Sequence, residues 1–267
     1  MTESHVTAPS GPARKAGKRG KRPAVHVPEL RLHNFRRAAP EPPPAAADVS
    51  CGIVDWGMLG NDTIGDCGPC ATEHDRMVKA CVSPATPTAA PGYEQGFVMP
   101  TAAATLSLYY AYGIAQGEPG PSPDQGVDNA SWLAWLFSQG VIEAYAEVDV
   151  ASPGAADRVH RAMVDFRGVI VGTHLTDDAE ALFEAHEPWT TATGESPDAN
   201  KGHDILLVAY DDTGDTFVTW GADQKSTLAW DAACIDEAWV ILTKEDADRA
   251  GYDFAAALKA IHDHLAL

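Results

Sequence analysis

The spacing of apolar residues divides the chain into a first half typical of helices and a second half typical of strands. Helical spacing marks three early segments, and loops rich in Pro and Gly separate them. Later, short β-branched runs on both sides of the polar turn 211–215 predict a hairpin. We expect helices over residues 67–82, 102–114, 131–138 and 155–165, a helical turn over 180–185, strands over 168–172, 204–210, 216–220 and 238–242, and a C-terminal helix with Phe254, Leu258, Ile261 and Leu265 on one face.

Residues 1–48 differ from the rest in composition. They are rich in Pro, Ala, Gly and Lys/Arg, and the stretch 40–44 is typical of an extended polyproline conformation. From residue 49 the composition is globular, without a second boundary or an internal repeat. We therefore expect an extended basic, Pro-rich arm over 1–48, in which no core forms, and one domain over 49–267.

The net charge of −19 hides an asymmetry between these two parts. The arm has nine Lys/Arg and four acids, whereas the remainder has ten Lys/Arg and 34 acids. An acidic domain repels phosphate, which argues against binding of nucleic acid or a membrane by the domain itself. The basic cluster 14–22 could contact nucleic acid, an acidic protein surface or the chain's own domain, or it could be a solvated tail.

No apolar run approaches the ~20 residues that a membrane helix needs, and the polar N-terminus lacks the apolar region of a signal peptide. We expect a soluble protein that does not contact membranes and is not secreted by the usual route. Its five cysteines are an odd number, too thinly spread for a disulfide scaffold and compatible with a reducing compartment.

Cys67 is the candidate nucleophile because a polar, Gly-containing loop leads directly into its helix. In the first helical turn, the unpaired backbone N–H groups and the positive end of the dipole favour a thiolate. Asp66 is the expected N-cap, but its charge opposes ionisation of the neighbouring thiol. An imidazolium partner would have to outweigh that charge.

Three groups of residues resemble motifs of the papain-like cysteine peptidases. Asn61, Gly65, Asp66 and Cys67 match a motif with Gln six residues before the nucleophilic Cys, although Asn61 is one methylene shorter than Gln. The segment 201–212 is similar to the strand that begins with the family's histidine, here His203. Sixteen residues later the family has an Asn that orients the imidazole, followed by a Trp. This chain has Thr219 and then Trp220.

The resemblance implies a papain-like α+β fold. Its helical half, with the nucleophile helix first, would pack on an antiparallel β half, and the extended basic arm would precede both. It also implies a thiol hydrolase, most simply a cysteine peptidase acting on a peptide or protein, without cofactor or metal. In that reaction Cys67 attacks a carbonyl, His203 transfers the proton, and Thr219 or Asp223 holds the ring. Asn61 and the Cys67 N–H would stabilise the oxyanion.

The same residues also resemble uncharacterised papain-fold proteins of tailed bacteriophages. That likeness rests on residues 56–62, 65–67, 202–203 and 219–221. It implies an alternative without catalysis, a minor capsid or decoration protein whose arm binds a capsid or other virion protein. Such a protein would be found in the virion or the host cytoplasm.

Other chemistries suit these residues less well. The pair Cys67 and Cys70 has the spacing of a thioredoxin dithiol, but no apolar strand precedes it. On one helix, Cys67 and Cys81 would lie ~21 Å apart, too far to share a zinc ion. The turn 211–215 lacks the Gly and the acid that a calcium-binding loop needs. We expect Cys70, Cys81 and Cys234 to be small apolar core residues.

Overall fold

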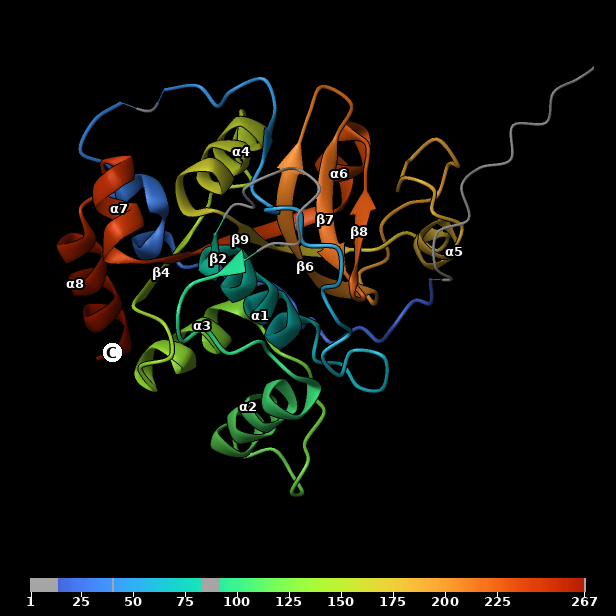
Figure 1. Ribbon diagram of the computed structural model, residues 1–267, viewed down its shortest axis with the longest axis horizontal. Coiled ribbons are helices and arrows are strands. Elements are labelled where there is room, and N and C mark those ends of the chain that lie inside the picture. The colour runs from blue at the N-terminus through green and yellow to red at the C-terminus, as the bar shows by residue number, and fades with distance from the viewer. Residues whose placement is uncertain (1–13, 40, 83–91, 267) are drawn as a thin grey trace, which may run out of the picture.

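An antiparallel sheet forms one side of the molecule, and helices cover it (Figure 1). The computed structural model describes residues 14–39, 41–82 and 92–266. Within them, the strand order of the sheet is β4-β9-β5-β6-β7-β8, and β1 pairs with β6. The strands are β1 (Ala47–Asp48), β4 (Ala144–Glu147), β5 (Val169–His174), β6 (Gly202–Tyr210), β7 (Asp215–Thr219), β8 (Ala222–Lys225) and β9 (Ile235–Leu242), with β2 (Cys81–Val82) and β3 (Gly92–Tyr93) forming a separate pair.

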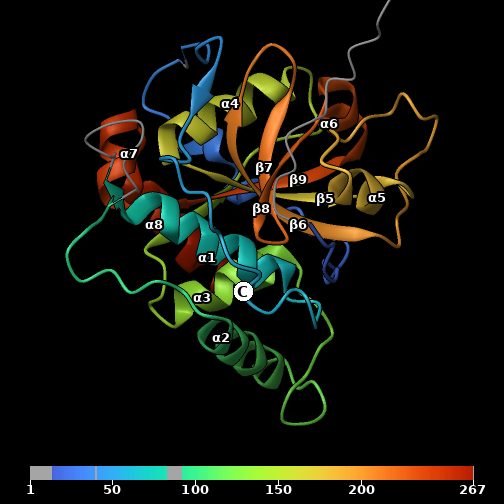
Figure 2. The same ribbon diagram turned by 45° about the vertical axis from the view of Figure 1, so that its right-hand side comes forward.

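Three helices gather beside the sheet, and α1 lies between the sheet and the other two (Figure 2). They are α1 (Cys67–Ala80), α2 (Ala102–Ala115) and α3 (Asn129–Ser138). The remaining helices are α4 (Ala155–Phe166), α5 (Ala179–Glu184), α6 (Leu228–Cys234), α7 (Lys244–Ala250) and α8 (Phe254–Leu265).

The long helices and strands match the sequence expectations, but β1, β2, β3, β4, β8, α6 and α7 were not predicted. Each has only two to seven residues, too few for a periodic pattern to be distinct. The helix expected over 67–82 ends at Ala80, and residues 81–82 form β2. The two short helices begin at side-chain caps, since Thr227 accepts from the backbone N–H of Trp230 and Thr243 from that of Asp246. Local capping and packing against the sheet therefore define them better than periodicity does.

Helix α1 is buried although many of its residues are polar. Its polar side chains have partners, which buried polar groups require. Trp132 Nε1 donates to Thr72 Oγ1 at 2.9 Å, and Lys79 Nζ donates to Asp75 Oδ2 at 2.5 Å. The nucleophile helix is thus held in the middle of the molecule rather than on its surface.

The expected arm is packed on the domain in the part that the structure describes. Val27, Leu30, Leu32 and Phe35 are buried in the same core as the sheet residues, and two 3-10 turns, Pro28–Leu30 and Leu32–Phe35, present them. The statement that no core forms in this segment is therefore wrong for residues 27–35. Residues 1–13 and Pro40 lie outside the described residues.

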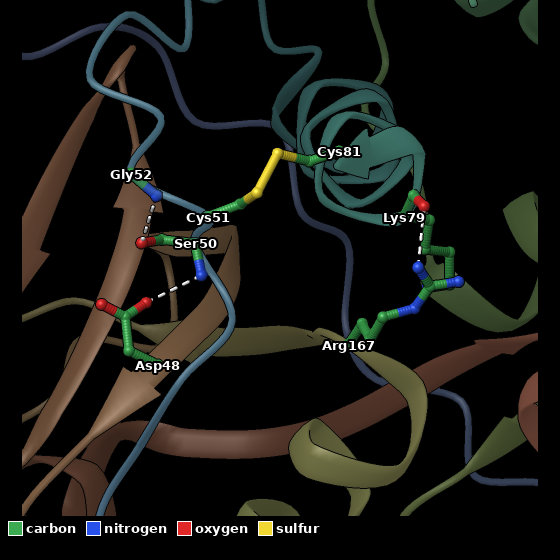
Figure 3. Close-up of a disulfide and its surroundings, with 7 residues drawn as sticks. All are labelled: Asp48, Ser50, Cys51, Gly52, Lys79, Cys81 and Arg167. Atoms are coloured by element: carbon green, nitrogen blue, oxygen red, sulfur yellow. Dashed lines mark hydrogen bonds between the residues drawn. A yellow bond between two sulfur atoms is a disulfide. The ribbon is translucent and has the colours of Figure 1, made fainter. Parts of the chain in front are cut away.

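A disulfide joins Cys51, in the loop after β1, to Cys81 at the end of α1 (Figure 3). This corrects the expectation that Cys81 is apolar core filling. Cys67, Cys70 and Cys234 are free and buried. Disulfides persist in oxidising surroundings, so this bond argues against the reducing compartment that the cysteine count suggested.

No helix within the described ranges is both long enough and apolar enough to span a membrane.

We predict that the double substitution Cys51→Ser and Cys81→Ser lowers the free energy of unfolding. The bond closes a loop of 30 residues, for which chain entropy predicts a loss of about 3.6 kcal/mol. Urea denaturation under oxidising conditions measures the loss. The reduced natural chain should behave like the double variant. Equal stability of oxidised and reduced natural chain would contradict the prediction.

Candidate active site

Cys67 is the first residue of α1, at the end of the loop 60–66, and is only 1% exposed. Asp66 occupies the N-cap position, as expected, but its side chain makes no capping hydrogen bond. The neighbouring Gly68 allows close packing, because a Cβ there would lie 2.4 Å from Val127 Cγ2. The sulfur is therefore in a tightly packed part of the protein.

His203 is the second residue of β6 and is fully buried. Its Nε2 shares a hydrogen bond with Thr219 Oγ1 at 2.7 Å, because β7 lies beside β6 and ends at Thr219. The Trp220 ring stacks on the imidazole with a centroid distance of 4.7 Å. The other ring nitrogen, Nδ1, is buried and has no hydrogen-bond partner among the described residues.

Asp204, a residue that sequence reasoning missed, links the helix to the strand. Its Oδ2 lies 3.7 Å from the Cys67 sulfur, and Asn129 Nδ2 donates to its Oδ1 at 2.7 Å. Because Asp204 directly follows His203, this contact places Cys67 against the start of β6. The sequence feature that could have identified Asp204 is its position as an acidic residue inside an otherwise apolar strand.

Of the two residues expected to hold the ring, Thr219 contacts it. Asp223 instead accepts a hydrogen bond from Trp56 Nε1 at 2.8 Å. Asn61 is buried in the loop before Cys67, and its Nδ2 donates to Ile64 O at 3.2 Å. The same side-chain amide hydrogen-bonds the Asp66 carboxyl group, which lowers the pKa of that group against the effect of burial.

Burial keeps both reactive groups neutral in this arrangement. It raises the pKa of the Cys67 thiol, and the charge of Asp204 raises it further. Burial also lowers the pKa of His203 to about 3, with the positive charge of Arg19 as a second cause. A thiolate–imidazolium pair is therefore disfavoured in the structure as it stands.

Residues 16–22, the cleft segment, explain this burial, because they lie across the nucleophile. The Gly20 N–H donates to the Cys67 sulfur at 3.2 Å. A Cβ on Gly20 would come within 1.6 Å of Gly65 O, so only glycine fits at this point. Main chain therefore lies directly on the thiol.

The cleft segment binds both halves of the molecule through its backbone. On the helical side, Lys18 N donates to Asn61 O at 2.5 Å, and Gly20 O accepts from Val127 N at 2.8 Å. On the sheet side, Trp220 Nε1 donates to Lys18 O at 3.2 Å. The segment is thus bound as an extended peptide, at the place where a substrate peptide would have to lie.

Charges hold the same segment. Arg19 pairs with Glu180 at 3.2 Å, Arg22 pairs with Glu118, and Lys21 pairs with Asp236 at 2.9 Å. Among the partners considered for the basic cluster, the structure therefore favours the chain's own acidic domain. Contact with nucleic acid stays a prediction.

The fold is similar to that of a known cysteine protease. Xylellain, a cysteine protease from Xylella fastidiosa, superposes with a TM-score of 0.57 at 14% sequence identity, over 88% of this chain and 99% of that one. At this identity the likeness shows the fold alone, and it confirms the papain-like α+β expectation. By sequence, the chain matches no family model and no curated protein.

We predict that Gly20→Val exposes Cys67, because its side chain cannot fit against Gly65. Alkylation of Cys67 by iodoacetamide should become at least about tenfold faster, since thiol reactivity follows exposure and ionisation. Peptide mapping separates Cys67 from Cys70 and Cys234. Lys15→Val, at an exposed arm position, is the control and should leave the rate unchanged. Equal alkylation rates of Cys67 in the natural chain and in Gly20→Val would contradict the position of the cleft segment over Cys67.

Proposed function

We propose that this chain is a papain-like thiol peptidase that is latent while its own cleft segment covers the nucleophile. The observation that carries the proposal is the contact of Cys67 with Asp204, the residue next to His203, together with the contacts of Thr219 and Trp220 with the His203 ring. The fold shared with a cysteine protease supports it.

In the proposed reaction, the Cys67 sulfur attacks the carbonyl carbon of a peptide bond. His203 Nδ1, the ring nitrogen without a partner, takes the thiol proton and passes it to the departing amine. Thr219 holds Nε2 and so fixes the orientation of the ring. The Cys67 backbone N–H and the side-chain amide of Asn61 stabilise the oxyanion. Water then hydrolyses the thioester and restores the thiol.

Latency follows from what the cleft segment does to this chemistry. It occupies the space of the substrate, and it keeps water from two groups that must ionise together. Once the segment leaves, hydration removes the burial that raises the pKa of Cys67 and lowers that of His203. The helix N-terminus then favours the thiolate.

The alternative, a virion module without catalysis, requires an arm that is free to bind another protein. Residues 14–22 lie against their own domain, and residues 27–35 supply part of the core. An arm that binds another virion protein would need neither of these contacts with its own domain. The peptidase is therefore the better supported of the two proposals.

We predict that the full-length Gly20→Val chain hydrolyses unfolded protein or a peptide library at least about tenfold faster than the natural chain, because the cleft segment no longer fits. Adding Cys67→Ala or His203→Ala to Gly20→Val should remove this activity. Lys15→Val should stay as latent as the natural chain.

Activity that survives Cys67→Ala would contradict the proposal. So would a correctly folded Gly20→Val chain, with Cys67 open to alkylation, that cleaves nothing in a complete peptide library.

We predict that Thr219→Val, in the Gly20→Val background, lowers kcat about fivefold with little effect on KM, since one hydrogen bond to the imidazole is worth roughly 1 kcal/mol. Thr219→Asn should preserve kcat, because an amide oxygen can accept from Nε2. The pH profile of kcat separates this positioning role from a structural one, because only the former moves the basic limb. Equal kcat and pH profile in the Val and Asn variants would contradict it.

A further inference from the structure

Lys21 directly follows Gly20, whose backbone N–H contacts the Cys67 sulfur. The side chain of Lys21 is fully buried in an acidic pocket. Its Nζ lies 2.9 Å from Asp236 Oδ2 and 3.2 Å from Glu237 Oε1. The stem passes over Gly172 of β5, where a Cβ would lie 2.2 Å from Lys21 Cε. A glycine inside a strand is typical of a place where another group approaches closely, and here that group is a lysine stem.

The pocket holds more acidic groups than one ammonium can neutralise. Asp236 and Glu237 contact Lys21 Nζ, and Asp204 interacts with it electrostatically. Burial raises the pKa of Asp204 to about 8 and also raises the pKa of Glu237. Burial lowers the pKa of Lys21, but Glu237, Asp204 and Asp236 outweigh it and raise the pKa overall. A neutral side chain here would leave the buried Glu237 without its cation, which is costly, whereas the partly exposed Asp236 would keep its contact with His174 at 3.0 Å.

The pocket is continuous with the candidate active site through Asp204. One oxygen of this carboxyl group contacts the Cys67 sulfur, and the group also lines the space around Lys21. The backbone of residues 20–22 is fixed by two hydrogen bonds to Val127. Any peptide that replaces this backbone over Cys67 therefore directs one side chain into the pocket.

We propose that the pocket formed by Gly172, Asp204, Asp236 and Glu237 selects peptide substrates that carry a Lys or Arg side chain beside the scissile bond. This inference rests on the proposed peptidase function. Lys21 occupies the pocket as a substrate side chain would.

Paired peptides that differ only by Lys or norleucine at each position in turn test the selection. With the full-length Gly20→Val chain, we expect one position at which Lys raises kcat/KM at least about tenfold. Asp236→Asn with Glu237→Gln should remove most of this ratio, whereas Glu245→Gln, an exposed acid on α7, should not change it.

Cleavage at equal rates with Lys and norleucine at every position would overturn the inference and leave the peptidase intact. Gly172→Ala narrows the pocket and should also remove the preference for Lys.

A binding measurement separates the two proposals, because it needs no catalysis. A synthetic peptide of residues 14–24 should bind the full-length chain carrying both Cys67→Ala and Gly20→Val. Replacing Lys21 by Met in the peptide should weaken the Kd at least about tenfold. Equal Kd values would mean that Lys21 makes only a structural salt bridge, and they would overturn the inference even if peptides are cleaved. Selective binding without any cleavage would instead reject the peptidase.

Discussion

The close packing of α1 on the start of β6 is the contact on which the site depends. It brings Cys67 to 3.7 Å from Asp204, the neighbour of His203, although 136 positions separate the cysteine from the histidine. Gly68 makes this approach possible, since a side chain there would meet Val127 at 2.4 Å and Asp204 at 3.2 Å. Anything that moved α1 away from the sheet would separate Cys67 from the start of β6.

The first 48 residues serve the domain in two ways. Residues 27–35 complete the core with four buried apolar side chains, so their removal would destabilise the fold. The cleft segment instead covers the site with polar and charged contacts, which exchange more readily with water. The arm and the domain carry opposite charges, so ion pairs can hold the segment on the domain. Exposed ion pairs are weak, whereas a large buried apolar surface would bind the segment too tightly to be displaced.

The sequence predicted those parts of the structure that depend on local pattern. The long helices, the hairpin and the placement of Cys67 and His203 follow from periodicity and motif spacing, and Thr219 was found by its distance from His203. The disulfide could not be predicted, because nothing local distinguishes Cys81 from a core cysteine. The placement of Lys21 could not be predicted either, since the pocket exists only where strands β5, β6 and β9 come together. Asp204 was missed although it stands as an acid inside an apolar strand. The buried arm was missed because its apolar residues stand among prolines and cations.

The central claim is that Cys67 and His203 share a proton once the cleft segment is displaced. The most direct test is the pH dependence of Cys67 alkylation in the Gly20→Val chain, with and without His203→Ala. The account predicts an inflection well below about 8.5, the pKa of a free thiol, and an upward shift when the imidazole is removed. The same inflection in both chains would show that the thiol ionises independently of His203, which would contradict the account.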